Sequence, residues 1–204
     1  IPGGSDAWRA VAKGELHADH FSVNGKWVPW YNLHKVYAGL RDAYRYTGSA
    51  DARAMLLELS GWALSLTSRL TEQQMQSMLR SEHGGMNEIF ADVYEITGDA
   101  RYLALARRFS HQAILDPLAA GQDRLGGLHA NTQIPKVIGF QRIGELTGER
   151  KFSDAARFFW TTVRERRTVA IGGNSVKEHF HDDKNFAPLI DEVEGPETCN
   201  PYNM

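Results

Sequence analysis

Residues 36–66 read VYAGLRDAYRYTGSADARAMLLELSGWALSL. Two apolar-periodic segments, Val36–Tyr46 and Ala50–Leu66, flank the triplet Tyr46-Thr47-Gly48, and their periodicity predicts two helices. Glycine readily adopts the left-handed conformation that commonly follows a helix C-terminus. The stretch therefore predicts a helical hairpin whose first helix ends at Gly48.

The same kind of triplet occurs twice more, as Ile96-Thr97-Gly98 and Leu146-Thr147-Gly148. The threonines are 97 − 47 = 50 and 147 − 97 = 50 residues apart, so the hairpin recurs at a fixed period. Stacked αα-hairpins bury their apolar faces against neighbouring hairpins. We therefore predict an all-α fold, an incomplete (α/α)6 barrel (toroid) built from repeated αα-hairpins. Asp51 and Asp99 lie near expected helix starts, and only Thr168–Ile171 resembles a short strand. The other expected helices are Asp6–Ala12, Ile89–Ile96, Ala100–Leu115, Val137–Leu146 and Phe152–Arg166.

The composition excludes several classes of protein. The 204 residues are 42% apolar and 24% charged, and the net charge of -2 provides no basic surface for nucleic acid. No apolar run approaches the roughly 18 residues of a membrane helix. The single cysteine, Cys199, cannot form an internal disulfide. We expect neither a nucleic-acid nor a membrane partner; no targeting signal is visible at Ile1, and both localisation and oligomeric state stay open.

Four aromatic residues lie close together before the first hairpin: Phe21, Trp27, Trp30 and Tyr31. A turn is predicted between them at Asn24-Gly25, and Pro29 is expected to break any helix just before Trp30. The aromatic rings either form a hydrophobic lid over a core or present a wall on which a sugar ring can stack. The sequence leaves both interpretations open.

A histidine precedes the first helix of each predicted hairpin: His34, His83 and His129. Gly84-Gly85 follows His83 and Gly126-Gly127 lies just before His129, and glycine permits close backbone approach. Equivalent ends of three hairpins would converge on one rim of a toroid, so we predict a shared polar pocket. The alternative is that each histidine is a packed structural residue. The histidines outside this register are expected on the surface: His17, His20 and His111.

Amide side chains accompany two of these histidines. Asn87 follows His83 in the run Glu82–Glu88, and Gln133 follows His129. Both are candidates for binding a polar ligand beside the histidines. An alternative is that Asn131 or Thr132 merely caps the next helix, with a proline, Pro135, in its first turn.

Two carboxylates and the cysteine follow the third hairpin. Glu178, after Gly172-Gly173, has polar neighbours and could donate or accept a proton. Glu197 and Cys199 are two residues apart, so both side chains would face one way in an extended segment, as a zinc ion would require. Two ligands do not define a metal site, and Cys199 could instead be a small core residue. Glu178 and Glu197 would also suit glycosidic acid–base chemistry.

Five motifs together resemble one family. They are YNLHKVYAGLRDAY (Tyr31–Tyr44), EHGGMNE (Glu82–Glu88), GLHANTQIPK (Gly127–Lys136), GGNSVKEHF (Gly172–Phe180) and ETCNPYNM (Glu197–Met204). Their order and content are similar to the β-L-arabinofuranosidase-type glycoside hydrolases, families 127 and 146, a bacterial group formerly described as a domain of unknown function. The resemblance covers nearly the whole chain. It implies that residues 1–204 are part of a single (α/α)6 catalytic domain.

The resemblance also implies a chemistry and a set of roles. Family members hold zinc with one glutamate and three cysteines; one cysteine attacks the anomeric carbon, and a separate glutamate is the acid/base, with net retention. Glu178 matches the acid/base, and Glu197 and Cys199 match two zinc ligands. The residues that match or neighbour the sugar-binding subsite are Trp30, His34, His83, Asn87, His129 and Gln133.

The resemblance places the remaining cysteines, nucleophile included, downstream of Met204, so the 204-residue chain alone is expected to be inactive. The sequence thus favours a zinc- and cysteine-dependent retaining glycosidase that acts on arabinose-containing plant glycans. Two alternatives stay open. One is another sugar enzyme on a helical toroid, either a two-carboxylate hydrolase or an epimerase. The other is a carbohydrate-binding scaffold without catalysis.

Overall fold

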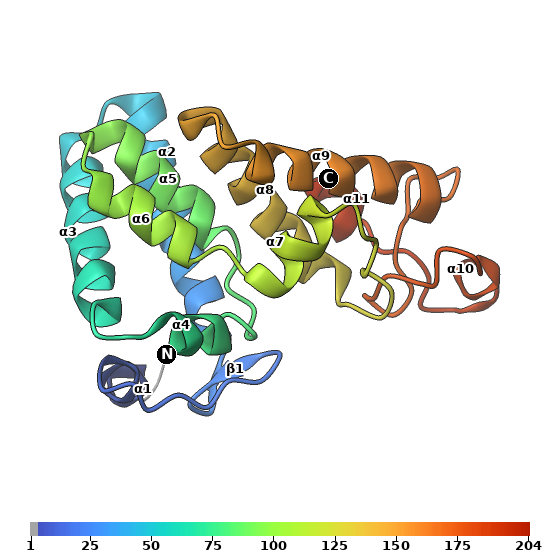
Figure 1. Ribbon diagram of the computed structural model, residues 1–204, viewed down its shortest axis with the longest axis horizontal. Helices are drawn as coiled ribbons and strands as arrows, with labels where there is room; N and C mark the ends of the chain where they lie inside the picture. Colours follow the sequence, from blue (N-terminus) through green and yellow to red (C-terminus); the bar gives the residue numbers. More distant parts are fainter. Residues whose placement is uncertain (1–3) are drawn as a thin grey trace. The chain divides into compact units, whose positions relative to one another are not determined.

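The computed structural model describes residues 4–204 and divides into two compact units (Figure 1). Unit 1 comprises Ile1–His111 and unit 2 comprises Gln112–Met204. That both belong to a single catalytic domain stays a prediction. Among residues 4–204, no helix is both long enough and apolar enough to cross a membrane.

Unit 1 is helical apart from one small hairpin. Its two strands pair antiparallel around the turn that was predicted at Asn24-Gly25. Both turn residues have positive φ, 49° and 70°, as a two-residue hairpin turn requires. The elements are α1 (Gly4–Ala12), β1 (Ser22–Val23), β2 (Lys26–Trp27), α2 (Pro29–Thr47), α3 (Ala50–Thr67), α4 (Glu72–Met78), α5 (Met86–Thr97) and α6 (Ala100–Arg108).

Unit 2 is built on the hairpin of its two longest helices, with shorter helices around it. Its elements are α7 (Gln112–Ala119), α8 (Ala130–Thr147), α9 (Arg150–Thr162), the π-helical η1 (Val163–Arg167), α10 (Ala187–Asp191) and α11 (Cys199–Asn203). The prediction of an all-α protein with recurring helix pairs is therefore confirmed. The pairs that the repeat predicts are α2 with α3, α5 with α6, and α8 with α9.

The three Thr-Gly punctuations have the same geometry. Gly48, Gly98 and Gly148 all lie in the left-handed region, with φ of 72°, 72° and 74°. Each preceding threonine hydroxyl donates to the carbonyl four residues earlier, at 2.6 to 2.8 Å. Two local preferences thus determine the hairpin turn: a threonine whose hydroxyl bonds a carbonyl of its own helix, and a glycine whose left-handed conformation ends that helix.

Several expected elements differ in their boundaries or in their type. The segment 100–115 forms two helices, because Gln76 of α4 donates to the carbonyls of Arg108 and Ser110 and so holds the chain out of helical geometry between α6 and α7. The last residues of the segment 152–166 continue α9 as a π-helical turn. Residues 168–171 form a turn, closed by a bond from the Gly172 amide to the Val169 carbonyl, in place of a strand.

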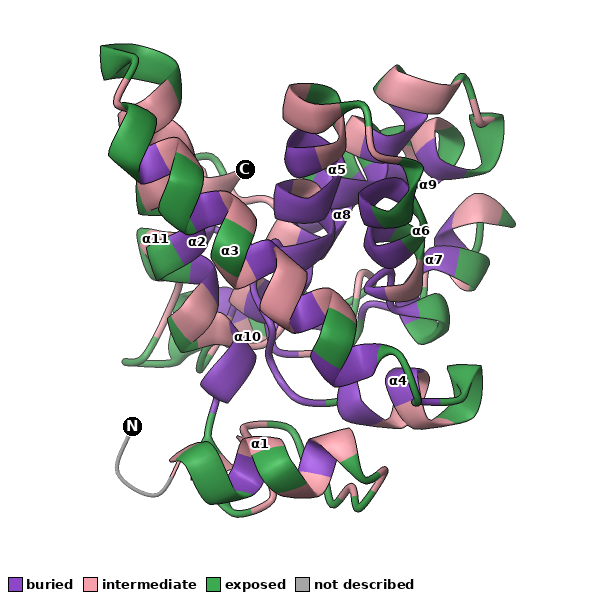
Figure 2. Ribbon diagram, turned by 90° about the vertical axis from the view of Figure 1, so that its left-hand side faces the viewer, coloured by how far each residue is buried: buried purple, intermediate pink, exposed green. Residues whose placement is uncertain are grey.

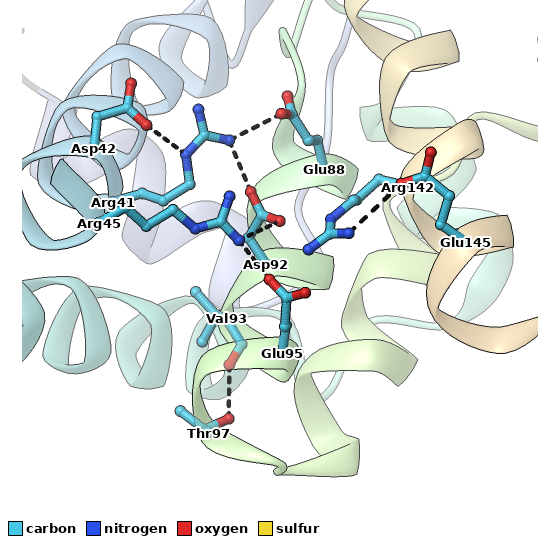
Figure 3. A network of polar contacts seen from close by, with 10 residues as sticks. All are labelled: Arg41, Asp42, Arg45, Glu88, Asp92, Val93, Glu95, Thr97, Arg142 and Glu145. Atoms are coloured by element: carbon cyan, nitrogen blue, oxygen red, sulfur yellow. Dashed lines mark hydrogen bonds and ion pairs between the residues drawn. The ribbon is translucent and has the colours of Figure 1, made fainter.

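Helices α2 and α5 of unit 1 are joined by a network of ion pairs (Figure 3). Asp92, whose side chain is 2% exposed, accepts from Arg41 at 2.8 Å and from Arg45 at 3.0 Å. Arg41 also reaches Glu88 at 2.9 Å, and Arg45 reaches Glu95 at 2.6 Å. Most of α5 is buried, as Figure 2 shows, so these charges fix its position against α2 in a place where an unpaired charge would be costly.

Candidate active site

In unit 1, the imidazole of His34 lies directly against the Gly84-Gly85 pair. A Cβ added at Gly84 would lie 2.6 Å from Nδ1 of His34, and one added at Gly85 would lie 3.0 Å from its Nε2. Gly84 also has a φ of 58°, which few other residues tolerate. The glycine pair is therefore the space into which the histidine ring fits. The sequence placed His34 before the first helix, but it lies inside α2, because Pro29 begins that helix earlier than the apolar pattern does.

Burial is the main feature of His34. The residue is 8% exposed, and its Nδ1 has no hydrogen-bond partner among residues 4–204. Burial, reinforced by the positive charges of Lys35 and Arg41, lowers the pKa of His34 from 6.5 to about 4. The ring is thus neutral at physiological pH and offers an acceptor or a donor to a neutral hydroxyl-bearing ligand.

His83 and Asn87 are fully buried next to this glycine pair. Nδ1 of His83 donates to the carbonyl of Ser81 at 2.9 Å, so the ring has a defined orientation. His111 was expected on the surface, but it is 9% exposed and its ring packs edge-on to His83 at 6.1 Å. The two histidines expected with it on the surface, His17 and His20, are exposed.

Trp30 belongs to the core of unit 1. It is 1% exposed, it packs edge-on against Trp8 and Phe109, and its indole N–H points to the sulfur of Met78 at 3.2 Å. Its indole face is covered by other side chains, so the core interpretation accounts for this residue and the sugar-stacking one does not. Of the four clustered aromatics, Phe21 and Trp27 form a separate stacked pair, and Trp27 is exposed.

In unit 2, backbone pairing brings Glu178 to the N-terminus of α8. The Ala130 amide donates to the carbonyl of Glu178 at 2.8 Å, and the Phe180 amide donates to the carbonyl of Leu128 at 2.9 Å. Lys177 and Glu178 both have positive φ, 47° and 65°. Two consecutive residues with positive φ form a two-residue hairpin turn, which is closed by mutual backbone hydrogen bonds between Val176 and His179.

This pairing places Glu178 beside His129. The Oε2 atom of Glu178 lies 3.6 Å from Nε2 of His129, and the ring of His179 stands perpendicular to that of His129 at 5.3 Å. The side chain of Glu178 is 56% exposed and that of His129 is 8% exposed. The site thus combines a reachable carboxylate with a buried imidazole.

The first turn of α8 fixes His129 and Gln133. The N-cap is His129 itself, whose Nδ1 accepts from the amide of Thr132; neither Asn131 nor Thr132 is the cap, so that alternative is wrong. The Gln133 amide donates to the His129 carbonyl and accepts from Lys136, which is 2% exposed. Gln133 is 3% exposed and is oriented at both ends by these bonds.

Glu197 and Cys199 are close together without an extended backbone between them. Thr198 is in a helical conformation and α11 begins at Cys199, yet the sulfur lies 2.9 Å from Oε2 of Glu197. Burial, together with the neighbouring Glu197 carboxylate, raises the pKa of the Cys199 thiol to about 11. The thiol is therefore protonated, and it donates to the Glu197 carboxylate.

The segments of Glu178 and Glu197 meet in a single cleft of about 430 Å³. Gly173 allows this approach, because a Cβ at that position would lie 2.0 Å from Pro196. Asn200, which is fully buried, donates to Ser175 at 2.6 Å and so ties α11 to the same loop. The cleft has the size of a small-molecule site. It is lined by Lys177, Glu178, Val193, Glu194, Gly195, Pro196 and Glu197.

The predicted residues therefore fall into two groups. In unit 1, His34, His83 and Asn87 gather around Gly84-Gly85; convergence with the residues of unit 2 stays a prediction. In unit 2, one set of segments carries Glu178, His129, Gln133, Glu197 and Cys199. The sequence reasoning missed Thr132 as a partner of His129, because histidine is not among the residues that usually cap a helix.

Repeated αα-hairpins, buried polar side chains and an exposed carboxylate at the edge of a cleft describe a helical protein with a candidate enzyme site. Comparison with protein families agrees. The protein-family model described as "Beta-L-arabinofuranosidase, GH127 catalytic domain" matches residues 7–204, so the chain belongs to this family of glycoside hydrolases. A search of curated proteins gave no match to the chain.

Proposed function

We propose that the protein is a retaining β-L-arabinofuranosidase that acts on arabinose-containing plant glycans, with Glu178 as acid/base and Glu197 and Cys199 as zinc ligands. The observation that carries this proposal is that Glu178 and Glu197 line the same cleft, with the Cys199 sulfur 2.9 Å from Glu197. Family membership supports the glycosidase chemistry and a carbohydrate substrate.

Glu178 is suited to two opposite proton transfers. Its side chain is 56% exposed at the cleft, so it can reach a glycosidic oxygen, while His129 approaches it from the buried side. In the first step, a cysteine thiolate other than Cys199 bonds to the anomeric carbon, the glycosidic C–O bond breaks, and Glu178 donates its proton to the leaving oxygen. In the second, Glu178 takes a proton from water, whose oxygen displaces the thiolate with net retention.

Glu197 and Cys199 fit a zinc ion by the nature of their donor atoms. A carboxylate oxygen and a sulfur already lie 2.9 Å apart and face each other, so a modest separation would let both bind one cation. The high pKa of the thiol follows from burial and from the adjacent carboxylate, and a divalent cation reverses this preference by stabilising the thiolate. When bound, zinc would supply the charge that keeps the coordinating thiols deprotonated.

The buried polar residues are suited to binding a neutral sugar. His34 is uncharged at physiological pH, and Gln133 has a fixed amide orientation, so both offer directed hydrogen bonds without a net charge. His83 and Asn87 extend the polar group around Gly84-Gly85. We propose sugar-binding roles for these four residues and for His129, each within its own unit. Trp30 is left out of this assignment because it is a core residue.

The test is release of p-nitrophenol from p-nitrophenyl β-L-arabinofuranoside by the full-length protein. Glu178→Gln and Cys199→Ser should each abolish turnover, whereas Glu194→Gln, an exposed carboxylate lining the same cleft, should leave it nearly unchanged. Zinc content should fall in Cys199→Ser and remain in Glu178→Gln. A wild-type protein that binds zinc, folds and releases no p-nitrophenol would contradict the substrate assignment, and sugar binding without turnover would favour the scaffold interpretation.

A further inference from the structure

The hydrogen bonds around His129 determine which of its ring nitrogens carries the proton. Nδ1 faces two groups of Thr132, the backbone nitrogen at 3.2 Å and the hydroxyl oxygen at 2.7 Å. A backbone N–H can only donate, so Nδ1 must present its lone pair. The hydroxyl at the same nitrogen then donates as well. The proton of the neutral ring is therefore on Nε2.

Nε2 is the nitrogen that faces Glu178, with 3.6 Å between it and Oε2. The Nε2–H group is therefore the part of the ring that lies nearest to the carboxylate. His179 stands perpendicular to the His129 ring on another side and limits its rotation. The backbone of His129 is fixed in turn by Gln133, which bonds its carbonyl at 3.1 Å.

From this geometry we infer that Thr132 is a positioning residue: its amide and hydroxyl lock His129 in the Nε2–H form and aim that N–H at Glu178. The inference rests on the proposed function, in which Glu178 is the acid/base. Thr132 itself is 1% exposed and bonds only the far side of the His129 ring, so it acts through the histidine and does not touch the substrate. Thr132 thus extends the proposed site by one residue, because it contacts the histidine that faces the Glu178 carboxylate.

The hydroxyl makes the shorter of the two contacts, and it can be removed alone. Thr132→Val retains the size of the side chain and the backbone amide but removes the 2.7 Å hydrogen bond. Loss of an orienting partner behind a functional histidine typically costs about 10- to 100-fold in activity at metal sites, and we expect a fall of about tenfold in kcat with little change in KM. Thr132→Ser keeps the hydroxyl and should retain most of the wild-type kcat.

The direct test is long-range proton–nitrogen NMR of the full-length protein, with the signals of His129 assigned by comparison with His129→Gln. The expected wild-type spectrum shows a non-protonated Nδ1 and a protonated Nε2. The opposite tautomer in the wild type would overturn the inference, and so would equal kcat values for Thr132→Val and Thr132→Ser at matched thermal stability. The spectrum requires no turnover, so a protein that fails on arabinofuranosides but shows the Nε2–H form would refute the proposed function alone.

Discussion

Replacing Gly84 by alanine tests whether the glycine pair exists to seat His34. The new Cβ would lie 2.6 Å from Nδ1 and 2.8 Å from Cγ of the His34 ring, and that ring is 8% exposed, so it has little room to move. Overpacking of this kind costs about 1 to 3 kcal/mol. The φ of 58° adds the left-handed penalty of an L-residue, about 1 to 2 kcal/mol. Gly84→Ala should therefore destabilise the protein by about 2 to 5 kcal/mol.

Gly98→Ala is the matched control, because Gly98 has a φ of 72° and no atom would lie within 4 Å of its Cβ. It should cost only the conformational part, about 1 to 2 kcal/mol. In a His34→Ala background, Gly84→Ala should fall to the same value, since the ring that it meets is gone. Urea unfolding of the full-length protein measures all four variants. Equal costs for Gly84→Ala and Gly98→Ala would refute the reasoning.

Two further predictions concern buried charge. The pKa of His34 is about 4 in the folded protein against 6.5 ordinarily. Its contribution to stability is therefore present above pH 6.5 and is lost as the pH falls towards 4, a loss of about 3 kcal/mol. Unfolding free energies measured across this range should depend less steeply on pH in His34→Gln than in the wild type. Asp92→Asn should lower the urea midpoint far more than Glu95→Gln, because the Asp92 side chain is 2% exposed and bonds both Arg41 and Arg45, whereas that of Glu95 is 46% exposed; equal shifts would contradict the assigned importance of Asp92.

The hairpin repeat could be predicted from the sequence because it depends on local chemistry. Thr97 bonds a carbonyl of its own helix, Gly98 supplies the left-handed residue, and Asp99 caps the next helix through its carboxylate, all within three residues. Gly48 and Gly148 supply the same left-handed residue, and Ser49 caps the helix that follows Gly48. Local signals of this kind are visible in one sequence without knowledge of the fold.

The element boundaries that were wrong depend on contacts between distant segments. Gln76, more than thirty residues earlier, bonds two carbonyls at the break after α6, and the arginines in the last turn of α6, Arg107 and Arg108, are a local stop signal that the sequence reasoning did not use. His111, which lies in that break, is consequently buried against His83 and is not on the surface. Trp30 likewise packs against residues on both sides of it in the sequence, Trp8 and Phe109. Hydrophobic periodicity describes one helix at a time and does not predict which distant residues contact it.

The placement of Glu178 illustrates why residue types could be predicted when geometry could not. A glutamate with positive φ, after a lysine with positive φ, is unfavourable locally, so no propensity argument would propose it. The conformation belongs to a two-residue turn in which Val176 and His179 exchange backbone hydrogen bonds, and pairing with residues 128–130 holds this turn against α8. In this turn the Glu178 carbonyl accepts from the Ala130 amide, and the Glu178 carboxylate lies at the cleft, 3.6 Å from His129. Only the rest of the structure can offset a local cost of about 1 to 3 kcal/mol of this kind, so a single sequence does not predict it.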